Sequence, residues 1–330
     1  MLTVGRVSLD LFSEQAGAPF PAIRSFATSV GGSPVNIAIG ASRLGLQTAT
    51  LTAVGEDPVG EFVLHSLKKE GVDTRYIVAI PQKRTGLAVV GVEPPDRFPL
   101  VFYRDDAADW HLSIDDACAA PVAEARILLL SGTALSASPC RDACFAAAER
   151  AQRASTRVWM DLDLRPDQWA HPLAFGVAMR RTFPYTDVCL GTEEEWWAAL
   201  APEPDSVMAG QAITERQRDE LAQLLEETQG QLPQLTMIVK CGAKGVQVHP
   251  AGEPMLHVPS LNVAVVNTVG AGDAFAAGLI ASRLQGASWE EAARFANACG
   301  AIVVSRPGCS QALPFQDEVK QLLAEKGELP

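Results

Sequence analysis

The sequence lacks the patterns that would place it in several large protein classes. No run of apolar residues among its 330 residues is long enough to span a membrane. Its seven cysteines contain no Cys-x-x-Cys pair and its five histidines are isolated, so no metal-binding spacing is present. An odd number of scattered cysteines is typical of a protein from a reducing compartment. Because no basic stretch or cleavage site follows Met1, we expect a cytoplasmic protein without a membrane partner.

Positive charge is also in short supply. The chain has 27 Lys and Arg against 39 Asp and Glu, a net charge of −12. This balance argues against a surface for nucleic acid, but a small anionic substrate feels only its local pocket. With 48% apolar and 20% charged residues, the composition is that of an ordinary globular protein. The length suffices for one large α/β domain or two average ones.

A glycine-rich turn lies within residues 266–284, VNTVGAGDAFAAGLIASRL, between an apolar segment and a predicted helix that starts near Asp273. The turn consists of Gly270, Ala271 and Gly272. Their backbone N–H groups are free of bulky side chains and lie at the positive end of the helix dipole, which favours an anion such as phosphate.

Two common phosphate-binding loops are absent from this stretch. Asp273-Ala274 stands where a Walker A loop has Lys and then Ser or Thr. Phe275 stands where the dinucleotide fingerprint has its third glycine. A nicotinamide-dependent oxidoreductase is therefore disfavoured.

Asp273 is the acidic residue of the predicted anion pocket. A carboxylate at a helix N-terminus is a good capping group. It equally suits a general base that takes the proton of a hydroxyl group as a phosphoryl group arrives. A non-catalytic binding protein would have no need of such a base, so the residue favours an enzyme.

This stretch closely resembles the second signature of the ribokinase-like (PfkB) sugar kinases, written D-T-x-G-A-G-D-x-F. One departure is Asn267, where the family has its leading Asp, and it affects any charge-dependent role of that position, such as ordering ions. Gly31-Gly32 followed by Asn36 resembles the family's other signature, and the motifs follow the family's order along the whole chain.

The resemblance implies an α/β protein with the ribokinase-like three-layer αβα fold, a mainly parallel central sheet and a small β-sheet lid. Alternating strand and helix patterns independently favour the α/β class. The chain would form a single kinase domain over 1–330, with lid segments at approximately 13–30 and 84–105. Residues 84–105 are predicted as two strands joined by a proline-rich turn. In the family the lid is often a dimer interface, so we expect a homodimer through the lid.

The resemblance also assigns roles to single residues. Asp273 would be the catalytic base, and Gly270, Ala271 and Gly272 would form the anion hole. Substrate contacts would come from Asp10, Gly32, Asn36, Tyr103, Arg104 and Arg165. Nucleotide contacts would come from Lys240, Gly242, Gly245 and Asn297. Glu195 would order Mg²⁺ through water. ATP and Mg²⁺ are the expected cofactors, with a monovalent cation as a further candidate.

Some of these residues have simpler explanations. Thr192 and Glu195 also fit a helix capping box. Asp10, at the predicted end of a strand over residues 2–12, suits a turn as well as a ligand. Arg104 suits a solvated surface position as well as an anion contact.

Four phrases resemble a subgroup of the family that phosphorylates a sugar acid. They are GRVSLDLF, RFPLVFYRDDAADW, DLDLRPDQW and NACGAIVVSRPGC. Arg165 follows a predicted strand over residues 157–162, and open α/β sheets bind ligands at the carboxyl ends of their strands. A guanidinium binds a carboxylate through two hydrogen bonds, which suits Arg104 and Arg165 to a sugar acid. A second sugar-acid subgroup has a similar arginine pair, and neutral-sugar kinases such as fructokinase have less use for one.

Overall fold

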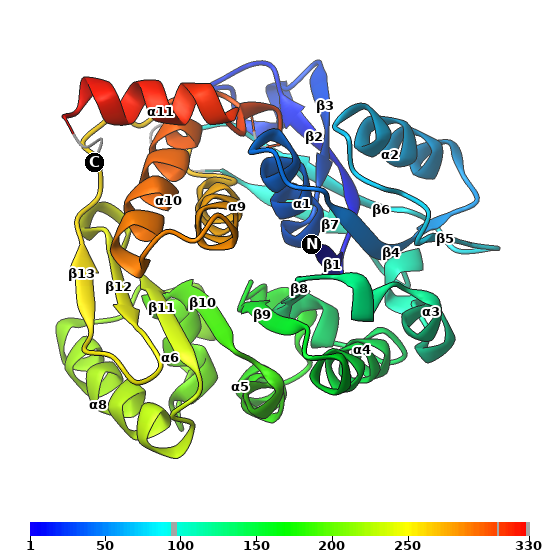
Figure 1. Ribbon diagram of the computed structural model, residues 1–330. Helices are drawn as coiled ribbons and strands as arrows, with labels where there is room; N and C mark the ends of the chain where they lie inside the picture. The colour runs from blue at the N-terminus through cyan, green and yellow to red at the C-terminus, as the bar shows by residue number, and fades with distance from the viewer. Residues whose placement is uncertain (94–97, 309, 328–330) are drawn as a thin grey trace. The chain divides into compact units, whose positions relative to one another are not determined.

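The computed structural model describes residues 1–93, 98–308 and 310–327 (Figure 1). The chain divides into two compact units. Unit 1 comprises Met1–Leu112 and the described residues from Leu261 onward, and unit 2 comprises Ser113–Ser260. Both units combine parallel strands with helices, which confirms the predicted α/β class.

Unit 1 contains a parallel group of strands and a set of helices. The strands lie in the order β1 (Leu2–Val4), β4 (Ala49–Gly55) and β5 (Ile77–Ile80). The α-helices are α1 (Ser33–Arg43), α2 (Pro58–Lys69), α9 (Ala271–Leu284), α10 (Trp289–Val304) and α11 (Gln316–Glu325). Short 3₁₀ turns are η1 (Phe20–Ala22), η2 (Ala108–His111) and η8 (Ser310–Ala312).

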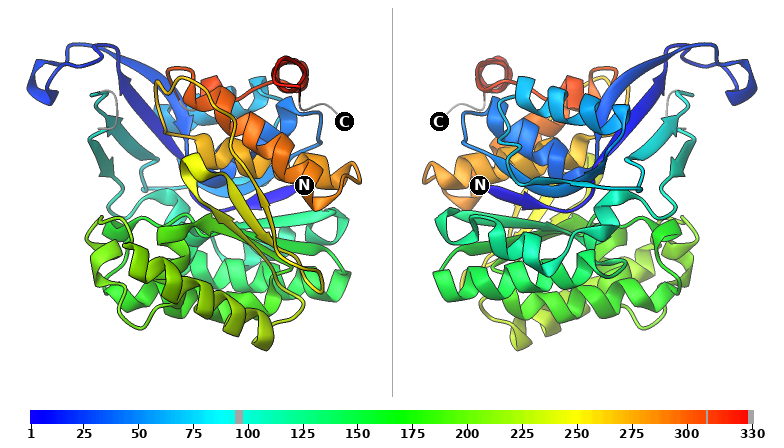
Figure 2. Two further views of the ribbon diagram at one scale, coloured as in Figure 1. Left: turned by 90° about the vertical axis from the view of Figure 1, so that its left-hand side faces the viewer. Right: turned by 90° about the vertical axis from the view of Figure 1, so that its right-hand side faces the viewer.

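Unit 1 also carries a separate accessory sheet, which confirms the predicted small second sheet. Its strands lie in the order β3 (Phe26–Gly31), β2 (Ser8–Ser13), β6 (Gly86–Val90) and β7 (Leu100–Tyr103). The β2–β3 and β6–β7 pairs are antiparallel and the β2–β6 pair is parallel. Figure 2 shows the β2–β3 pair reaching away from the helices of its own unit. The predicted proline-rich turn at residues 94–97 lies outside the described residues.

The prediction of one strand over residues 2–12 is wrong. Gly5, at φ +143°, ends β1, and the chain then enters β2 in the other sheet. Only glycine adopts such a φ at little cost, so this residue lets one apolar segment serve two sheets. Asp10 consequently lies within β2, not at a strand end.

Unit 2 is built on a mainly parallel sheet. Its strands lie in the order β13 (Leu256–Val258), β12 (Val246–His249), β11 (Thr236–Lys240), β10 (Val188–Thr192), β9 (Arg157–Asp161) and β8 (Ile127–Ser131). Strands β8 to β11 are parallel, and β12 and β13 are antiparallel. The α-helices are α3 (Ile114–Ala119), α4 (Cys140–Ala154), α5 (Pro172–Thr182), α6 (Glu193–Leu200), α7 (Asp205–Met208) and α8 (Glu215–Gln231). The 3₁₀ turns are η3 (Val122–Glu124), η4 (Gly132–Leu135), η5 (Pro166–Gln168), η6 (Phe183–Tyr185) and η7 (Gly242–Lys244).

The core of unit 2 fixes where its polar side chains emerge. All five residues of β8 are buried, as expected for a parallel strand covered on both faces. Trp196 of α6 is fully buried, and its indole N–H donates to the carbonyl of Ile238 at 2.9 Å. Because parallel strands share a direction, their carboxyl ends meet at one edge. That edge carries Asp161, Thr192 and Lys240.

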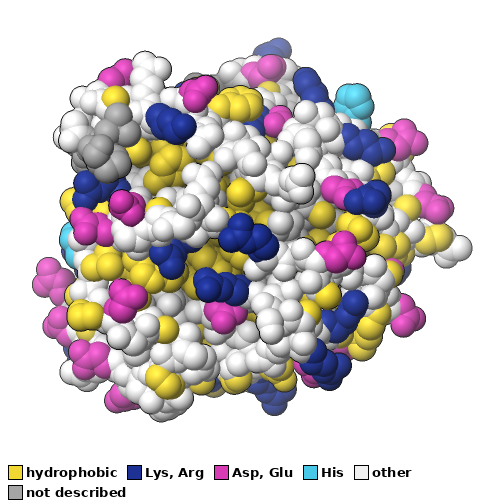
Figure 3. Space-filling model, viewed as in Figure 1, with side chains coloured by type: hydrophobic (Ala, Val, Ile, Leu, Met, Phe, Trp, Pro, Cys, Tyr) yellow, Lys and Arg dark blue, Asp and Glu magenta, His cyan; other side chains and the backbone are white. Residues whose placement is uncertain are grey.

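The surface and the thiols agree with the composition. Acidic and basic side chains are interspersed over the face seen in Figure 3. The six described cysteines are free thiols, all but Cys118 buried. Within the described parts of the chain, no helix is long and apolar enough to cross a bilayer.

Candidate active site

The glycine-rich turn opens helix α9 in unit 1. Gly270 is the N-cap residue at φ +86°, a left-handed conformation that glycine adopts without strain. The helix begins at Ala271, two residues before its predicted start, so Asp273 lies in the first turn. The first backbone N–H groups of a helix have no partner within it and carry the positive end of the dipole. The turn therefore has the features of an anion-binding site.

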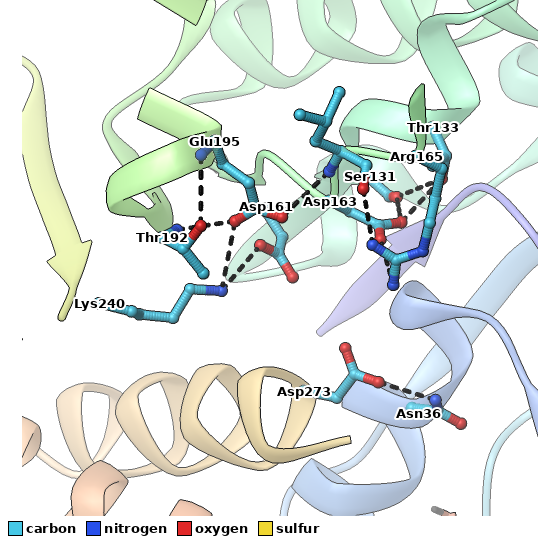
Figure 4. A network of polar contacts seen from close by, with 11 residues as sticks. Asn36, Ser131, Thr133, Asp161, Asp163, Arg165, Thr192, Glu195, Lys240 and Asp273 are labelled. Carbon is cyan, nitrogen blue, oxygen red and sulfur yellow. Dashed lines mark hydrogen bonds and ion pairs between the residues drawn. The ribbon is translucent and has the colours of Figure 1, made fainter. Parts of the chain in front are cut away.

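Asp273 is hydrogen-bonded to Asn36 (Figure 4). The side-chain amide Nδ2 of Asn36 donates to Oδ2 of Asp273 at 2.8 Å. Asn36 is buried and Asp273 is half-buried. The bond holds one oxygen of the predicted base beside a residue predicted to contact substrate.

Close helix packing creates this pair. A Cβ added at Gly40 of α1 would lie 2.8 Å from Cβ of Ala277 on α9, so glycine lets the two helices cross tightly. Asn36 and Asp273 each lie one turn before these contact residues. A Cβ at Gly278 would likewise lie 2.7 Å from Sγ of Cys299, which seats α10 against α9. Gly40 and Gly278 thus let these helices pack closely enough to fix the position of Asp273.

Asn267, the departure from the family signature, supports the same turn. Its Nδ2 donates to the carbonyl of Gly308 at 2.6 Å, and its Oδ1 accepts from the N–H of Val269 at 3.0 Å. The side chain is 5% exposed. An ionised aspartate has no proton to donate to Gly308, so the Asn267 amide makes a structural contact that an aspartate could not make.

The two signature glycines make room for close backbone and carboxylate approaches. A Cβ at Gly31 would lie 1.9 Å from Oδ2 of Asp10, and one at Gly32 would lie 2.4 Å from the carbonyl oxygen of Arg6. Gly32 is at φ +107°. Asp10 itself accepts a hydrogen bond from Oγ of Ser8 at 2.7 Å. The glycines therefore permit the half-buried position of the Asp10 carboxylate.

Arg104 lies inside unit 1 and not on a solvated surface. Its guanidinium Nη2 is 2.8 Å from Oδ2 of Asp109, with side chains 4% and 2% exposed. Oδ2 of Asp109 also accepts from the N–H of Val7 at 3.0 Å. Gly86 permits this position, because a Cβ there would lie 3.1 Å from Nη1 of Arg104. Its neighbour Tyr103, in contrast, is 61% exposed.

Arg165 in unit 2 is anchored by Asp163 (Figure 4). Asp163, at φ +37° and 3% exposed, accepts hydrogen bonds from Oγ of Ser131 and Oγ1 of Thr133, both at 2.8 Å. Its other oxygen lies 3.1 Å from Nη2 of Arg165. The Arg165 side chain is 36% exposed. A buried carboxylate with three donors thus fixes a partly exposed guanidinium.

Glu195 forms the capping box that the sequence suggested. Its Oε2 accepts from the N–H of Thr192 at 2.7 Å, and its Oε1 accepts from the N–H of Leu164 at 3.0 Å. Nζ of Lys240 lies 3.8 Å from Glu195 and 3.4 Å from Asp161. Two carboxylates and a lysine therefore converge at the carboxyl ends of β9, β10 and β11, which is the type of site that phosphates with a hard cation require.

The remaining predicted nucleotide residues lie at two places, Gly242 and Gly245 at η7 and Asn297 on α10. Gly242, at φ +56°, has no heavy atom within 4 Å of an added Cβ. At Gly245, at φ +95°, the Cβ would lie 2.1 Å from the carbonyl oxygen of Val258, so the chain's own backbone fills that space. Asn297 is half-buried on α10.

Sequence reasoning missed three buried aspartates. Asp163 and Asp161 were detectable as a pair, because Asp-Leu-Asp stands at the end of a buried strand. Asp109 gave no such signal, since its contact with Val7 joins residues separated by 102 positions. Among the described residues, no group of three or more His, Cys, Asp or Glu could hold a metal ion by itself.

Known proteins resemble the whole chain. The family model "pfkB family carbohydrate kinase" matches residues 1–316. A 5-dehydro-2-deoxygluconokinase from Shouchella clausii is 32% identical over 99% of this chain and 96% of its own. A putative ribokinase II from E. coli, solved with ATP and Mg²⁺, matches at a TM-score of 0.82 and 25% identity, with 98% of both chains covered.

A second similar structure is a double mutant of fructokinase from Vibrio cholerae, solved with fructose, ADP and potassium. Its TM-score is 0.79 at 26% identity, with 98% of this chain and 97% of that chain covered. These matches confirm the predicted ribokinase-like fold. The chain belongs to the pfkB family of carbohydrate kinases and is a sugar phosphotransferase.

Proposed function

We propose that the protein transfers the γ-phosphoryl group of ATP to the C6 hydroxyl group of 5-dehydro-2-deoxy-D-gluconate. The observation that carries the proposal is the Asp273 carboxylate, held by Asn36 in the first turn of a glycine-opened helix. The similarity to 5-dehydro-2-deoxygluconokinase supports the choice of substrate.

In the proposed reaction Asp273 accepts the proton of the C6 hydroxyl group as its oxygen attacks phosphorus. Asn36 orients the carboxylate through the 2.8 Å hydrogen bond. The backbone N–H groups at Gly270, Ala271 and Gly272 stabilise the negative charge that develops on the transferred group. Phosphoryl transfer asks mainly for positioning and charge, which these residues provide.

The nucleotide role belongs to Lys240, Gly242, Gly245 and Asn297. Lys240 would place its charge beside phosphate oxygens, and Glu195 would order Mg²⁺ through water. When bound, Mg²⁺ neutralises phosphate charge. The residues suit it, because Mg²⁺ in kinases takes one or two carboxylates plus phosphate oxygens. A monovalent cation is a further candidate, which turnover in KCl against tetramethylammonium chloride tests.

The substrate carboxylate is assigned to Arg165 and Arg104, and its hydroxyl groups to Asp10, Gly32 and Asn36, with Tyr103 as a further contact. Arg165 supports a sugar acid most directly, because its guanidinium is positioned by Asp163 and partly exposed. The nearest alternative is 2-dehydro-3-deoxygluconate, which carries the same carboxylate. A neutral-sugar kinase such as a fructokinase would have less use for two arginines at the substrate.

The proposal includes a homodimer formed through the accessory sheet as a lid. Large apolar side chains of that sheet are exposed: Phe26 at 36%, Leu100 at 44%, Val101 at 43% and Tyr103 at 61%. Sedimentation analysis should give the mass of a dimer, and Val101→Glu should shift it to the monomer. A monomeric wild-type protein would contradict the proposed homodimer and leave the proposed reaction untouched.

The test is ADP release from ATP–Mg²⁺ with 5-dehydro-2-deoxygluconate, 2-dehydro-3-deoxygluconate, fructose and ribose. We expect the highest kcat/KM for the first. Preference for the second would keep the carboxylate assignment and replace the substrate. Turnover of neutral sugars alone would contradict the roles of Arg104 and Arg165.

A further inference from the structure

Unit 2 contains a cavity of about 820 Å³ that none of the assigned residues lines. It is lined by residues of α4, of α5 and of the segment between η5 and α5. Its apolar lining includes Phe145, Trp169, Leu173 and Val177. Leu173 and Val177 are 40% and 42% exposed, so this apolar surface is open to solvent.

The polar rim of the cavity is basic. Arg141 and Arg181 line it, together with His171, whose Nδ1 accepts from the N–H of Leu173, and Asp142 as the acidic member. Arg141 donates to Oγ of Ser138 at 2.8 Å and lies 3.9 Å from Asp142, so its charge is only loosely paired. For Arg181 the structure records no ion pair with any residue it describes. A locally positive rim on a chain of net charge −12 favours an anionic occupant.

Trp169 adds an unused donor to this wall. The residue is 9% exposed, and its indole Nε1–H is buried without an acceptor in the described parts of the chain. A buried donor without a partner is costly, and an acceptor on an occupant would offset that cost. The apolar lining, the basic rim and the Trp169 donor thus all favour an occupant with an apolar body and an anionic acceptor group.

We propose that this cavity binds a small amphipathic carboxylate with a flat apolar body. The body packs against Phe145, Leu173 and Val177, and the carboxylate pairs with Arg181 and Arg141. The volume lies within the range of ligand pockets. Binding here requires no turnover, so the proposal stands independently of the proposed function.

The probe is 2-naphthoate, with 2-naphthamide as its neutral counterpart, measured by titration calorimetry on the full chain. Naphthoate should bind at one site, and the amide at least about tenfold more weakly, since its neutral carbonyl cannot form an ion pair with the arginines. Arg181→Ala should weaken naphthoate about tenfold, and Val177→Glu should abolish its binding. Arg153→Ala, an exposed arginine on α4 outside the cavity, should leave it unchanged.

Several outcomes would overturn the proposal. They are equal binding of the amide, an unchanged affinity in Arg181→Ala, or retained binding in Val177→Glu. A change of oligomeric state in Val177→Glu would instead identify the cavity as a contact between copies of the chain. Trp169→Phe keeps the apolar wall and removes the donor, so it should weaken naphthoate several-fold.

Discussion

Two arginines predicted for the same substrate carboxylate have different surroundings. Arg104 in unit 1 is sealed in an ion pair with Asp109, with side chains 4% and 2% exposed. Arg165 in unit 2 pairs with an equally buried carboxylate, Asp163, but its own side chain is 36% exposed. The aspartates are alike, and the exposure of the arginines differs.

The difference separates two uses of an arginine that look identical in a sequence. The Arg104 charge is already neutralised in a dry environment, so a substrate would have to share it with Asp109. Arg165 is positioned by its aspartate and remains accessible to a ligand. Removing Asp109 should therefore lower the unfolding free energy, whereas removing Arg165 should lower the affinity for substrate.

The largest effect is expected from Asp109→Asn. It leaves the buried Arg104 charge uncompensated, which typically costs about 3–5 kcal/mol of unfolding free energy. Urea unfolding followed by circular dichroism measures the loss. The control is Asp106→Asn, whose carboxylate is 64% exposed and pairs with Lys83 and His111, and it should change stability little. Equal unfolding curves for Asp109→Asn and wild type would contradict the structural role given to the Arg104–Asp109 pair.

Arg165→Ala should act on affinity instead. We expect KM for the sugar acid to rise about 10–100-fold, the value of a lost charge-assisted pair. Arg165→Lys keeps the charge without the planar fork and should recover part of the loss. Steady-state kinetics with Arg153→Ala as control measures this. An unchanged KM in Arg165→Ala would show that this arginine does not bind the carboxylate.

A smaller effect concerns Asp57, a third carboxylate of low exposure, which is held by neutral donors. Burial opposes its charge, but hydrogen bonds from Thr85 and from the N–H of Gly60 hold its pKa below the usual value of 3.8. Its contribution is therefore present above pH 3.8 and is lost as pH falls through the lowered folded-state pKa. Asp57→Ala removes the N-cap of α2 and should cost about 1–2 kcal/mol at neutral pH. The unfolding free energy of the variant should depend less on pH in the acid range than that of the wild type. An unchanged pH dependence would contradict the role given to the Asp57 carboxylate.

The local chemistry of the chain was readable from its sequence. The capping box at Thr192 and the two strands within residues 84–105 followed from local residue patterns. The division of residues 2–12 between two sheets was not readable, because it depends on the positive φ of Gly5.

Contacts between distant residues were the other limit. Asn36 and Asp273 are 237 positions apart, and their bond depends on the helix crossing at Gly40. The burial of Arg104 likewise depends on Asp109 and on the absence of a side chain at Gly86. Residue types indicated which groups could act, while packing determined which are accessible.

The most direct test of the central claim is Asp273→Asn. The asparagine can still accept the hydrogen bond from Asn36, so the geometry and the binding of sugar acid and ATP should be kept. Loss of the base should lower kcat by about 10²–10⁴-fold. Binding by calorimetry and single-turnover phosphoryl transfer would be measured on the same preparation. Retained binding with that loss of kcat is the predicted result, and near-full turnover by the variant would contradict the assignment of Asp273 as the base.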